Sequence, residues 1–472
     1  MNAPPPPLLD RFAAIVGAAH ALREPSAIAP YLAEPRDRFH GRSPLVLKPG
    51  SVAEVSAIVA LASEARTGIV PQGGNTGVVG GQIPSAKGDE IVVSLSRLNR
   101  IRAVDADSYA MTLDAGVILA DAQKAAADAG RLLPLSLASE GSCQIGGNIS
   151  TNAGGTGVLA YGNTRDLVLG IEAVLPSGEV WDGLRTLRKD NTGYDLKDLF
   201  IGAEGTLGIV TGAVLKLFPK PKGTSVAFIG LADPSAALAL FHVARAAAGL
   251  GVTGAEIMPR IALDTVTTYV PGARDPLAAA HPWYLLLEVS SSRSQGDAEA
   301  MVEAIFAEGH DKGLVEDGAR AQSLDQAAQF WRLRHALSEV QKHLGGSIKH
   351  DVAVPVGAVP ELIQRTSAAM TAMIPGSRPF PFGHIGDGNI HLNLSQPPGM
   401  DKQAFLARWE AVNEAVHAIA LSLGGTISAE HGIGTLKRDL LPGVKGAVEM
   451  DLMRRIKATL DPHGIMNPGK VL

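Results

Sequence analysis

The sequence predicts an α+β protein of two or three domains. The chain has 472 residues and 46% hydrophobic residues, enough to bury a large core. Segments typical of β-strands are followed repeatedly by segments in which apolar residues recur at helical spacing. Glycine makes up 53 of the 472 residues, about 11% against a usual frequency of about 7%, and it is clustered in 73–81, 141–157, 202–212 and 424–434. These clusters predict loops where the backbone approaches another group closely.

Composition excludes several classes of protein. The net charge of -5 comes from 42 basic and 47 acidic residues without a block of one sign, which argues against nucleic acid as a partner. The first ten residues carry four prolines and no signal-peptide pattern, so we expect a short extended arm. No apolar run approaches the roughly 20 residues of a membrane span. Cys143, the only cysteine, excludes an internal disulfide and fits a reducing compartment; we expect a small buried residue and a cytoplasmic protein, with any membrane contact peripheral.

Sequence patterns divide the chain into two main blocks. In the first, the capping box Ser51-Val-Ala-Glu starts a helix that we expect to end at Gly68. The other elements expected in this block are a short apolar strand that leads from Gly68 into a glycine loop, strands at 91–95 and 111–116, an Ala-rich helix after 116, and a hairpin of 167–175 with 179–181. Pro219-Lys-Pro221 closes the block.

The second block again alternates strands and helices. Its expected strands are 226–231, 283–289, 347–355 and 388–394, and its expected helices are 234–250, 297–308, 324–344 and one from 361. A last helix is expected at 448–460. We therefore predict an N-terminal arm and helix (1–40), a first domain (41–220), a second domain (221–425) and a C-terminal segment (426–472).

The loop Pro71–Gly81 is the densest glycine cluster. Its five glycines in eleven positions expose backbone N–H groups that could form an anion nest, and Asn75 and Thr76 add donors. The alternative is a flexible turn. Gly155–Ala160 matches the Gly-x-Gly-x-x-Ala pattern of nicotinamide dinucleotide sites, but no strand precedes it and Tyr161–Asn163 should stop a helix before it forms.

Two histidines stand seven residues apart in a second glycine-rich motif. The turn Gly386–Gly388 between His384 and His391 can fold one imidazole toward the other, and His391 and Asn393 share one face of a strand. Isolated histidines are often structural, hydrogen-bonded residues. A metal site is the other interpretation, and residue types alone leave both open.

An acidic residue and a further imidazole follow in Ser428-Ala-Glu430-His431-Gly-Ile-Gly434. Two histidines and one glutamate suit Zn²⁺ with open coordination positions. The sequence therefore offers His384, His391 and Glu430 as candidate metal ligands.

Three long motifs together resemble one family. Pro71–Gly81, then Glu140–Asn148 with Thr151–Gly155, then Gly202–Val210 are similar to the vanillyl-alcohol oxidase type of flavoprotein, in the branch of D-2-hydroxyglutarate and D-lactate dehydrogenases. The resemblance runs from about Pro44 to the C-terminus. It implies FAD held between two α+β subdomains, an α+β cap domain for the substrate, and a C-terminal segment that returns to the FAD domain.

The resemblance assigns many residues to the cofactor. The expected FAD-binding residues are Pro71, Gly73, Gly74, Asn75, Thr76, Gly77, Gly81, Glu140, Gly141, Ser142, Gly147, Asn148, Asn152, Gly154, Glu204, Gly205, Gly208, Ile209, Val210 and Asn467. No histidine occurs in either glycine loop, so we expect FAD to be bound without a covalent link.

The resemblance also implies a reaction. His384, His391 and Glu430 would hold a divalent metal, expected to be Zn²⁺, that binds the carboxylate and 2-hydroxyl group of a D-2-hydroxy acid. His431 would act as the base, and hydride would pass from C2 to the flavin. An electron-transfer flavoprotein or a quinone would then accept the electrons. By analogy with the family, the chain would form a homodimer.

The substrate is predicted from a small set of polar residues. Arg334 and Ser338 are four apart on an expected helix and thus share a face, and Lys349 and Asn393 complete the set. Hydroxyglutarate dehydrogenases carry Arg, Thr and Lys at the first three positions, so Ser338 departs from the pattern. Ordinary solvated cations are the alternative interpretation of Arg334 and Lys349.

A lysine able to bind a second carboxylate predicts a dicarboxylate such as D-2-hydroxyglutarate or D-malate. D-lactate or glycolate dehydrogenase is the alternative. A non-catalytic FAD-binding subunit is a remoter one.

Overall fold

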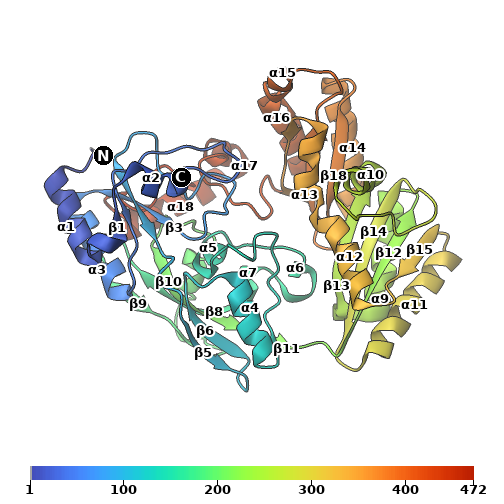
Figure 1. The fold of residues 1–472 in the computed structure, drawn as a ribbon, viewed down its shortest axis with the longest axis horizontal. Helices are drawn as coiled ribbons and strands as arrows, with labels where there is room; N and C mark the ends of the chain where they lie inside the picture. Colours follow the sequence, from blue (N-terminus) through green and yellow to red (C-terminus); the bar gives the residue numbers. More distant parts are fainter. Residues whose placement is uncertain (1–2) are drawn as a thin grey trace. The chain divides into compact units, whose positions relative to one another are not determined.

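The computed structural model describes residues 3–472 and divides the chain into two compact units. The first unit contains the chain up to Gly155, Tyr161–Lys220 and Glu430–Leu472. The second contains Thr156–Ala160 and Pro221–Ala429. Figure 1 follows the chain through both units by colour. The C-terminal part of the chain, from Glu430 onward, therefore folds with the N-terminal half.

The first unit contains two main sheets and a short two-stranded pairing. One sheet has the order β1-β2-β4-β3, in which β2, β4 and β3 run parallel, and the other is antiparallel with the order β5-β6-β10-β8-β9. The strands are β1 (Ala21–Leu22), β2 (Val46–Leu47), β3 (Gly68–Gln72), β4 (Glu90–Ser94), β5 (Ile101–Asp105), β6 (Ala110–Asp114), β7 (Arg131–Leu132), β8 (Val168–Val174), β9 (Val180–Asp182), β10 (Ile209–Lys216) and β11 (Phe218–Pro219). The hairpin expected between 167 and 181 is confirmed as β8 and β9.

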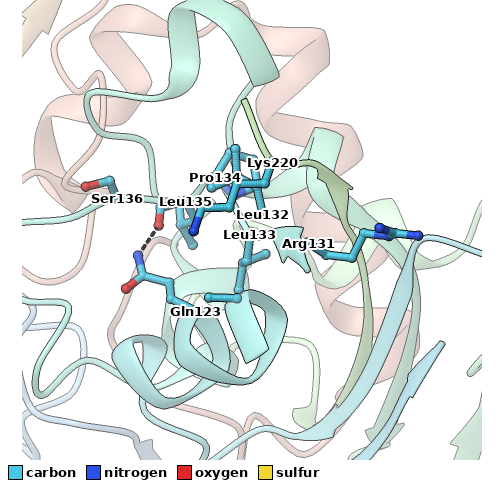
Figure 2. A pocket seen from close by; sticks show the side chains of 9 residues that line it. Gln123, Arg131, Leu132, Leu133, Pro134, Leu135, Ser136 and Lys220 are labelled. Carbon is cyan, nitrogen blue, oxygen red and sulfur yellow. Dashed lines mark hydrogen bonds between the residues drawn. The ribbon is translucent and has the colours of Figure 1, made fainter. Parts of the chain in front are cut away.

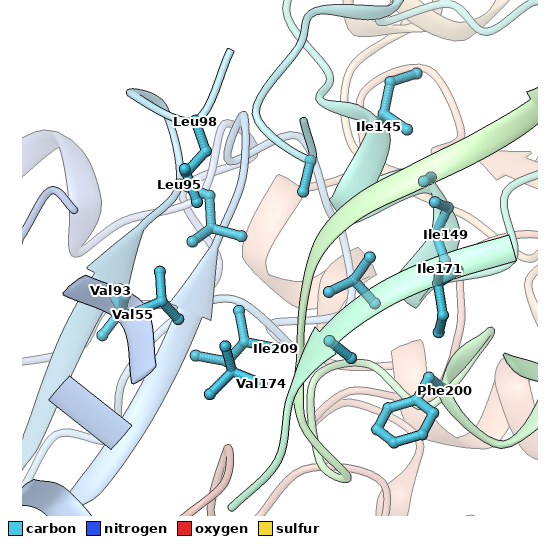
Figure 3. Packing of buried hydrophobic residues seen from close by; sticks show 14 of the residues in the cluster. Val55, Val93, Leu95, Leu98, Ile145, Ile149, Ile171, Val174, Phe200 and Ile209 are labelled. Carbon is cyan, nitrogen blue, oxygen red and sulfur yellow. The ribbon is translucent and has the colours of Figure 1, made fainter. Parts of the chain in front are cut away.

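Helices and a large apolar core hold the first unit together. The helices are α1 (Pro6–Val16), η1 (Ala18–His20), α2 (Pro25–Ile28), η2 (Ala29–Tyr31), α3 (Val52–Ala65), α4 (Leu119–Asp128), α5 (Ile145–Ser150), α7 (Thr164–Leu167), α8 (Lys197–Phe200), η6 (Arg438–Leu440), α17 (Leu441–Val444) and α18 (Ala447–Leu460). Figure 3 shows side chains of α3, β4, α5, β8 and β10 meeting in the core. Burial of such side chains is the main stabilising contribution to this unit.

The start of α3 follows its sequence signal. The Ser51 hydroxyl accepts a hydrogen bond from the Glu54 N–H, and the Glu54 carboxylate accepts one from the Gly50 N–H. The predicted end was wrong, because Arg66 takes the left-handed conformation and stops the helix at Ala65. Gly68 instead begins strand β3.

The N-terminal segment is helical where an extended arm was expected. Helix α1 begins at Pro6, with prolines in its first turn. A proline there loses no helical hydrogen bond and already has a helical φ. Phe12 is fully buried in the core of the first unit. Residues 1 and 2 lie outside the described part of the chain.

The second unit is built on one antiparallel sheet. Its order is β15-β12-β14-β13-β18-β19-β16, and β17 also pairs with β19. The strands are β12 (Gly223–Leu231), β13 (Val252–Pro259), β14 (Trp283–Ser291), β15 (Asp317–Arg320), β16 (Ser347–Ile348), β17 (Val352–Ala353), β18 (Arg378–His384) and β19 (Asn389–Ser395).

Helices cover both faces of this sheet. They are α9 (Pro234–Ala248), η3 (Gly249–Gly251), α10 (Arg260–Tyr269), α11 (Gln295–Asp311), α12 (Leu324–His335), α13 (Leu337–Val340), η4 (Gln341–Leu344), η5 (Val356–Ala358), α14 (Val359–Met373), α15 (Lys402–Leu406) and α16 (Trp409–Ser422). Alternate strand residues belong to different cores: Leu285 and Leu287 pack with α9, α11, α14 and α16, whereas Tyr284 and Leu286 pack with α10, α12 and α13. The sheet is thus buried on both faces, as its nearly continuous apolar strands require.

Two predicted elements of the second unit need correction, and two central strands were missed. The helix expected over 324–344 ends at His335, and Ala336 separates it from α13. The strand expected over 347–355 is split into β16 and β17, with Lys349, His350 and Asp351 between them. Strands β13 and β18 were not predicted, although both are central to the sheet.

The nicotinamide-like pattern at Gly155–Ala160 does not form a dinucleotide fold. A single helical turn, α6 (Val158–Tyr161), does form there, contrary to the expectation of no helix. Turns precede it where the nicotinamide fold requires a strand. Leu159 packs instead against the core of the second unit.

Candidate functional site

Three of the segments predicted to bind the cofactor lie together in the first unit, and the 430–434 loop joins them. The side-chain N–H₂ of Asn467 donates to the carbonyl groups of Gly81, at 2.8 Å, and Glu204, at 2.7 Å. The Glu204 carboxylate accepts hydrogen bonds from the Ile433 and Gly434 N–H groups at 2.7 and 2.8 Å. Asn467 and Glu204 therefore tie the first glycine loop to the 202–210 segment, the 430–434 loop and the C-terminus.

Glu204 is a buried carboxylate with an unusual ionisation. Glu204 is 8% exposed, and burial raises the pKa of its carboxyl group to about 6. The Ile433 and Gly434 N–H groups and Lys437 act in the opposite direction and lower this pKa. Two backbone donors are too few to replace the lost hydration. Glu204 thus holds the 430–434 loop, a role that its assignment to the cofactor did not foresee.

Asn75 does not supply the side-chain donors that the sequence suggested. Its side-chain N–H₂ donates to the carbonyl groups of Pro30, at 3.0 Å, and Ala33, at 2.8 Å, and its oxygen accepts from Gln82. Both amide hydrogens are therefore used to hold the loop against the N-terminal segment. The expectation that they serve a phosphate was wrong, because the chain itself supplies the acceptors.

The glycine segments have the shape of a cradle for a flat or phosphorylated group. A Cβ at Gly74 would lie 2.0 Å from the Ser142 carbonyl oxygen, so the two loops touch through their backbones. A Cβ at Gly141 or Gly147 would meet nothing within 4 Å, so the packing of the chain does not require glycine there. The buried Gln144 Oε1 has no hydrogen-bond partner among the described residues. Open space and an orphaned acceptor fit a bound cofactor.

Two neighbouring side chains serve the scaffold of this cradle. Burial raises the pKa of the Cys143 thiol, and the residue is 1% exposed, as expected for a packing residue. The Glu140 carboxylate accepts from Gln123 at 3.3 Å. Figure 2 shows a pocket lined by Gln123 of α4 and by the segment Leu132–Ser136. None of the predicted site residues lines this pocket.

In the second unit, sheet register gathers polar side chains on one face. His384 stands directly opposite Glu256 across β13 and β18, and opposite Asn389 across β18 and β19. His391 and Asn393 follow at alternate positions of β19, opposite Phe382 and Phe380. Cross-strand partners lie on the same side of a sheet. The rings of His384 and His391 are 6.0 Å apart between centroids, so the turn brings them together as predicted.

Glu256 is the centre of this polar face. It is 1% exposed, and its two oxygens accept from Arg334 Nε and His384 Nδ1, each at 2.5 Å. Burial acts to raise its pKa, but Arg334 and His384 lower it to about 2. The Arg334 guanidinium also lies over the Phe382 ring, 4.9 Å from its centroid. Arg334 donates to Glu256 through Nε, so this hydrogen bond does not use its terminal amino groups.

The second histidine has its own acidic neighbour. His391 Nδ1 lies 4.0 Å from the Asp351 carboxylate, which is 2% exposed and also accepts from the Asn389 side chain at 2.9 Å. Asp351 occupies the break between β16 and β17. In both imidazoles Nδ1 faces a carboxylate, so Nε2 is the atom that could carry a lone pair toward a metal.

The predicted substrate residues surround this break. Lys349 Nζ donates to the Ser338 carbonyl group at 2.8 Å, so these two residues are neighbours. The Asn393 oxygen accepts from the His350 N–H at 3.3 Å. Arg334 is joined to His384 through Glu256. Glu430 and His431 open the last segment of the first unit, directly after Ala429, the last residue of the second.

Sequence reasoning missed Glu256, Asp351 and Asn389. Glu256 could have been found as the one carboxylate in the apolar run Val252–Pro259, where a buried charge needs partners. Asp351 and Asn389 lie close in sequence to Lys349 and His391, but their contact depends on the pairing of β17 with β19.

Comparisons with known proteins identify the class. The domain described as "FAD linked oxidases, C-terminal domain" matches residues 220–471, and the "FAD binding domain" matches residues 43–183. The chain therefore belongs to the family of FAD-linked oxidases. Its FAD-binding domain confirms the predicted cofactor.

Individual proteins and solved structures are similar to nearly the whole chain. A D-2-hydroxyglutarate dehydrogenase from Xanthomonas citri pv. viticola is 38% identical, over 98% of this chain and 96% of the relative. A putative mitochondrial D-lactate dehydrogenase from Schizosaccharomyces pombe is 37% identical, over 92% of this chain and 82% of the relative. Among solved structures, substrate-bound p-cresol methylhydroxylase has a TM-score of 0.76 at 16% identity, covering 98% of this chain and 96% of that one. The predicted fold, α+β of the vanillyl-alcohol oxidase type, is confirmed.

Glu204 should leave a signature in the pH dependence of stability. A raised carboxyl pKa means that the folded protein keeps a proton that the unfolded chain has already lost, so its stabilising contribution is complete below about pH 4.5 and falls as pH rises through 6. We expect the difference in unfolding free energy between wild type and Glu204→Gln to fall by about 2 kcal/mol between pH 4.5 and 7. Denaturant titrations at several pH values measure it, with the exposed Glu179→Gln exchange as control. A difference that is constant with pH would contradict the assignment.

Proposed function

We propose that this protein is an FAD-dependent dehydrogenase that oxidises a D-2-hydroxy acid to the 2-oxo acid, with D-2-hydroxyglutarate or D-malate preferred. The proposal rests on the polar face of the second unit, where Arg334 and His384 share the buried Glu256 carboxylate and the His391 ring lies beside that of His384. A face of this kind can bind a carboxylate next to a cation. It occurs in a chain whose other half belongs to an FAD-binding domain.

The donor set suits a divalent metal. His384 and His391 each direct Nδ1 toward an acidic side chain, which is the outer-shell arrangement typical of histidine ligands. Glu430 is the proposed third ligand, by its family pattern, and zinc is the proposed ion because nitrogen and oxygen donors with open positions suit it. Bound FAD would supply the acceptor for the hydride from C2 of the substrate, and a metal held by His384, His391 and Glu430 would supply a Lewis acid for the 2-hydroxyl group.

Residues of the chain have separate tasks in this proposal. Arg334 binds the substrate carboxylate through its terminal amino groups. Lys349 binds the second carboxylate of a dicarboxylic acid. His431 takes the proton of the 2-hydroxyl group. Its loop is held in place by the hydrogen bonds that the Ile433 and Gly434 N–H groups donate to Glu204.

The remaining proposals concern the surroundings of the reaction. FAD is proposed to be bound without a covalent link, and flavin left on the polypeptide after acid precipitation would contradict this. An electron-transfer flavoprotein or a quinone is the proposed acceptor, and the protein is proposed to act in the cytoplasm as a homodimer. Among residues 3–472, no helix combines the length and apolarity needed to cross a membrane.

A smaller acid is the second candidate substrate. One relative of similar identity is named a putative D-lactate dehydrogenase. Ser338 also replaces the threonine of the hydroxyglutarate pattern, which removes a methyl group beside Lys349. D-lactate and glycolate therefore belong in every substrate comparison.

Loss of the proposed base should separate chemistry from binding. We expect His431→Ala to lower kcat by roughly 10²- to 10⁴-fold, the usual contribution of a general base. FAD content and bound metal should stay close to wild type. Steady-state turnover with an artificial dye acceptor, flavin absorbance and metal analysis provide the three readouts.

The control for this variant is His463→Ala, an exposed histidine of the same C-terminal segment. Its turnover should match wild type. Near-normal turnover in His431→Ala would remove His431 as the base. Full activity after complete removal of metal by a chelator would remove the metal from the proposal.

Lys349 should discriminate between dicarboxylic and monocarboxylic acids. A charge-assisted hydrogen bond contributes about 1.5 to 3 kcal/mol, so Lys349→Met should lower kcat/KM for D-2-hydroxyglutarate by roughly 10- to 150-fold. The value for D-lactate should change little. Lys342→Met, which removes an exposed lysine nearby, controls for the loss of charge. Equal kcat/KM of the unaltered protein for both acids would contradict the preference.

A further inference from the structure

We propose that Glu256 is a positioning residue that sets which nitrogen of His384 faces the proposed metal while it holds the substrate arginine, Arg334. The inference rests on the proposed function, because it takes His384 as a metal ligand. It adds a residue from β13 to the site, and it makes one carboxylate responsible for both metal and substrate recognition.

The burial of Glu256 has no other explanation in its surroundings. The residue is 1% exposed on a sheet face whose neighbouring positions, Met258 and Leu286, belong to an apolar core. A buried carboxylate costs several kcal/mol unless charges and donors compensate it. Here each oxygen has one strong donor, from Arg334 and from His384. Among the described residues, only these two contacts compensate the charge of the buried carboxylate.

The contact with His384 selects one tautomer of its ring. An ionised carboxylate only accepts hydrogen bonds, so His384 Nδ1 must carry the hydrogen. In the neutral imidazole the lone pair then resides on Nε2, which is the state that a metal requires. Glu256 therefore prepares His384 for metal binding before any metal arrives.

Rigid elements fix the geometry of this contact. Glu256 and His384 are directly paired across β13 and β18. Arg334 comes from α12, whose Phe330 and Leu333 are buried in the same core as Met258. The three side chains are thus placed by sheet register and helix packing, and small rotations of the side chains cannot exchange their partners.

An amide in place of the carboxylate would serve only one of the two donors. Glutamine has one acceptor oxygen and a donor N–H₂ group. The charged Arg334 has the stronger demand for the oxygen, so the N–H₂ group would face His384 Nδ1. That contact favours a hydrogen on Nε2, the atom that should bind the metal. Glu256→Gln should therefore weaken metal binding without removing a ligand.

Metal affinity tests this directly. In the purified protein, loaded with FAD and stripped of metal, Zn²⁺ affinity is measured by competition with a chromophoric chelator. Flavin content and Tm report whether the protein is folded. We expect Glu256→Gln to bind Zn²⁺ roughly 10- to 100-fold more weakly than wild type, the usual effect of losing an outer-shell partner. Affinity equal to wild type would overturn the proposal.

Glu288→Gln is the matched control. Glu288 is a half-buried carboxylate of the same sheet that accepts from Thr253 at 2.7 Å and from Trp331 of α12 at 2.8 Å. It supports the helix of Arg334 without touching Arg334 or His384. We expect its Zn²⁺ affinity to stay at the wild-type value. A loss as large as that of Glu256→Gln would reduce Glu256 to a structural residue.

A double variant separates tautomer control from general damage. In Glu256→Gln with Arg334→Met, the competing donor is gone, so the glutamine oxygen can accept from His384 Nδ1. The double variant should regain about 10-fold in Zn²⁺ affinity over Glu256→Gln alone. A further loss would overturn the tautomer argument.

A measurement on the unaltered protein covers the case in which the variants do not fold. In metal-free protein with ¹⁵N-labelled histidine, the His384 signals, assigned by their loss in His384→Gln, should show hydrogen on Nδ1. Hydrogen on Nε2 with none on Nδ1 would overturn the proposal. Wild type that binds no Zn²⁺ would overturn the proposed metal site and this inference with it, whereas wild-type binding that Glu256→Gln leaves unchanged would overturn the inference alone.

Discussion

A carboxylate buried in an apolar sheet is the constraint on which the second unit's site depends. Glu256 has lost nearly all contact with water, and the ionised form persists because Arg334 and His384 surround it. Removing either partner would leave a buried charge uncompensated, at a cost of several kcal/mol. The stability of the sheet and the arrangement of the site therefore rest on the same three side chains. Mutations at this face will alter both together.

The first unit uses a buried glutamate for a different purpose. Glu204 meets backbone N–H groups rather than formal charges at close range, so burial dominates and its pKa rises to about 6. Glu256 meets a guanidinium and an imidazole, and its pKa falls to about 2. The same side chain thus organises a loop in one unit and a charged site in the other. The difference follows from the partners that each fold supplies.

Patterns local in the sequence predicted much of the fold. The capping box at Ser51 starts α3, and the alternating runs of the second block correspond to β12, β14 and β19. The two histidines were predicted to meet because a glycine turn lies between them, and their rings are 6.0 Å apart. In each case the residues that decide the structure are close neighbours in the chain.

Contacts between distant segments were beyond these patterns. Glu256 meets His384 only because β13 pairs with β18, and neither strand was predicted. Asn75 was expected to offer its donors to a ligand, but the fold places the carbonyl groups of Pro30 and Ala33 against them. The Glu256–His384 contact and the hydrogen bonds of Asn75 both depend on how distant segments pair in the fold. A local hydrophobic pattern does not contain that information.

Reduction of the flavin by a hydroxy acid is the step that the proposed dehydrogenase activity requires. The purified protein, loaded with FAD and Zn²⁺, is mixed without oxygen or any acceptor with D-2-hydroxyglutarate, its L enantiomer or D-lactate. We expect full bleaching of the visible flavin absorbance by D-2-hydroxyglutarate, with slower bleaching by D-lactate and none by the L enantiomer. An unchanged flavin spectrum with D-2-hydroxyglutarate, D-malate, D-lactate and glycolate alike would contradict it.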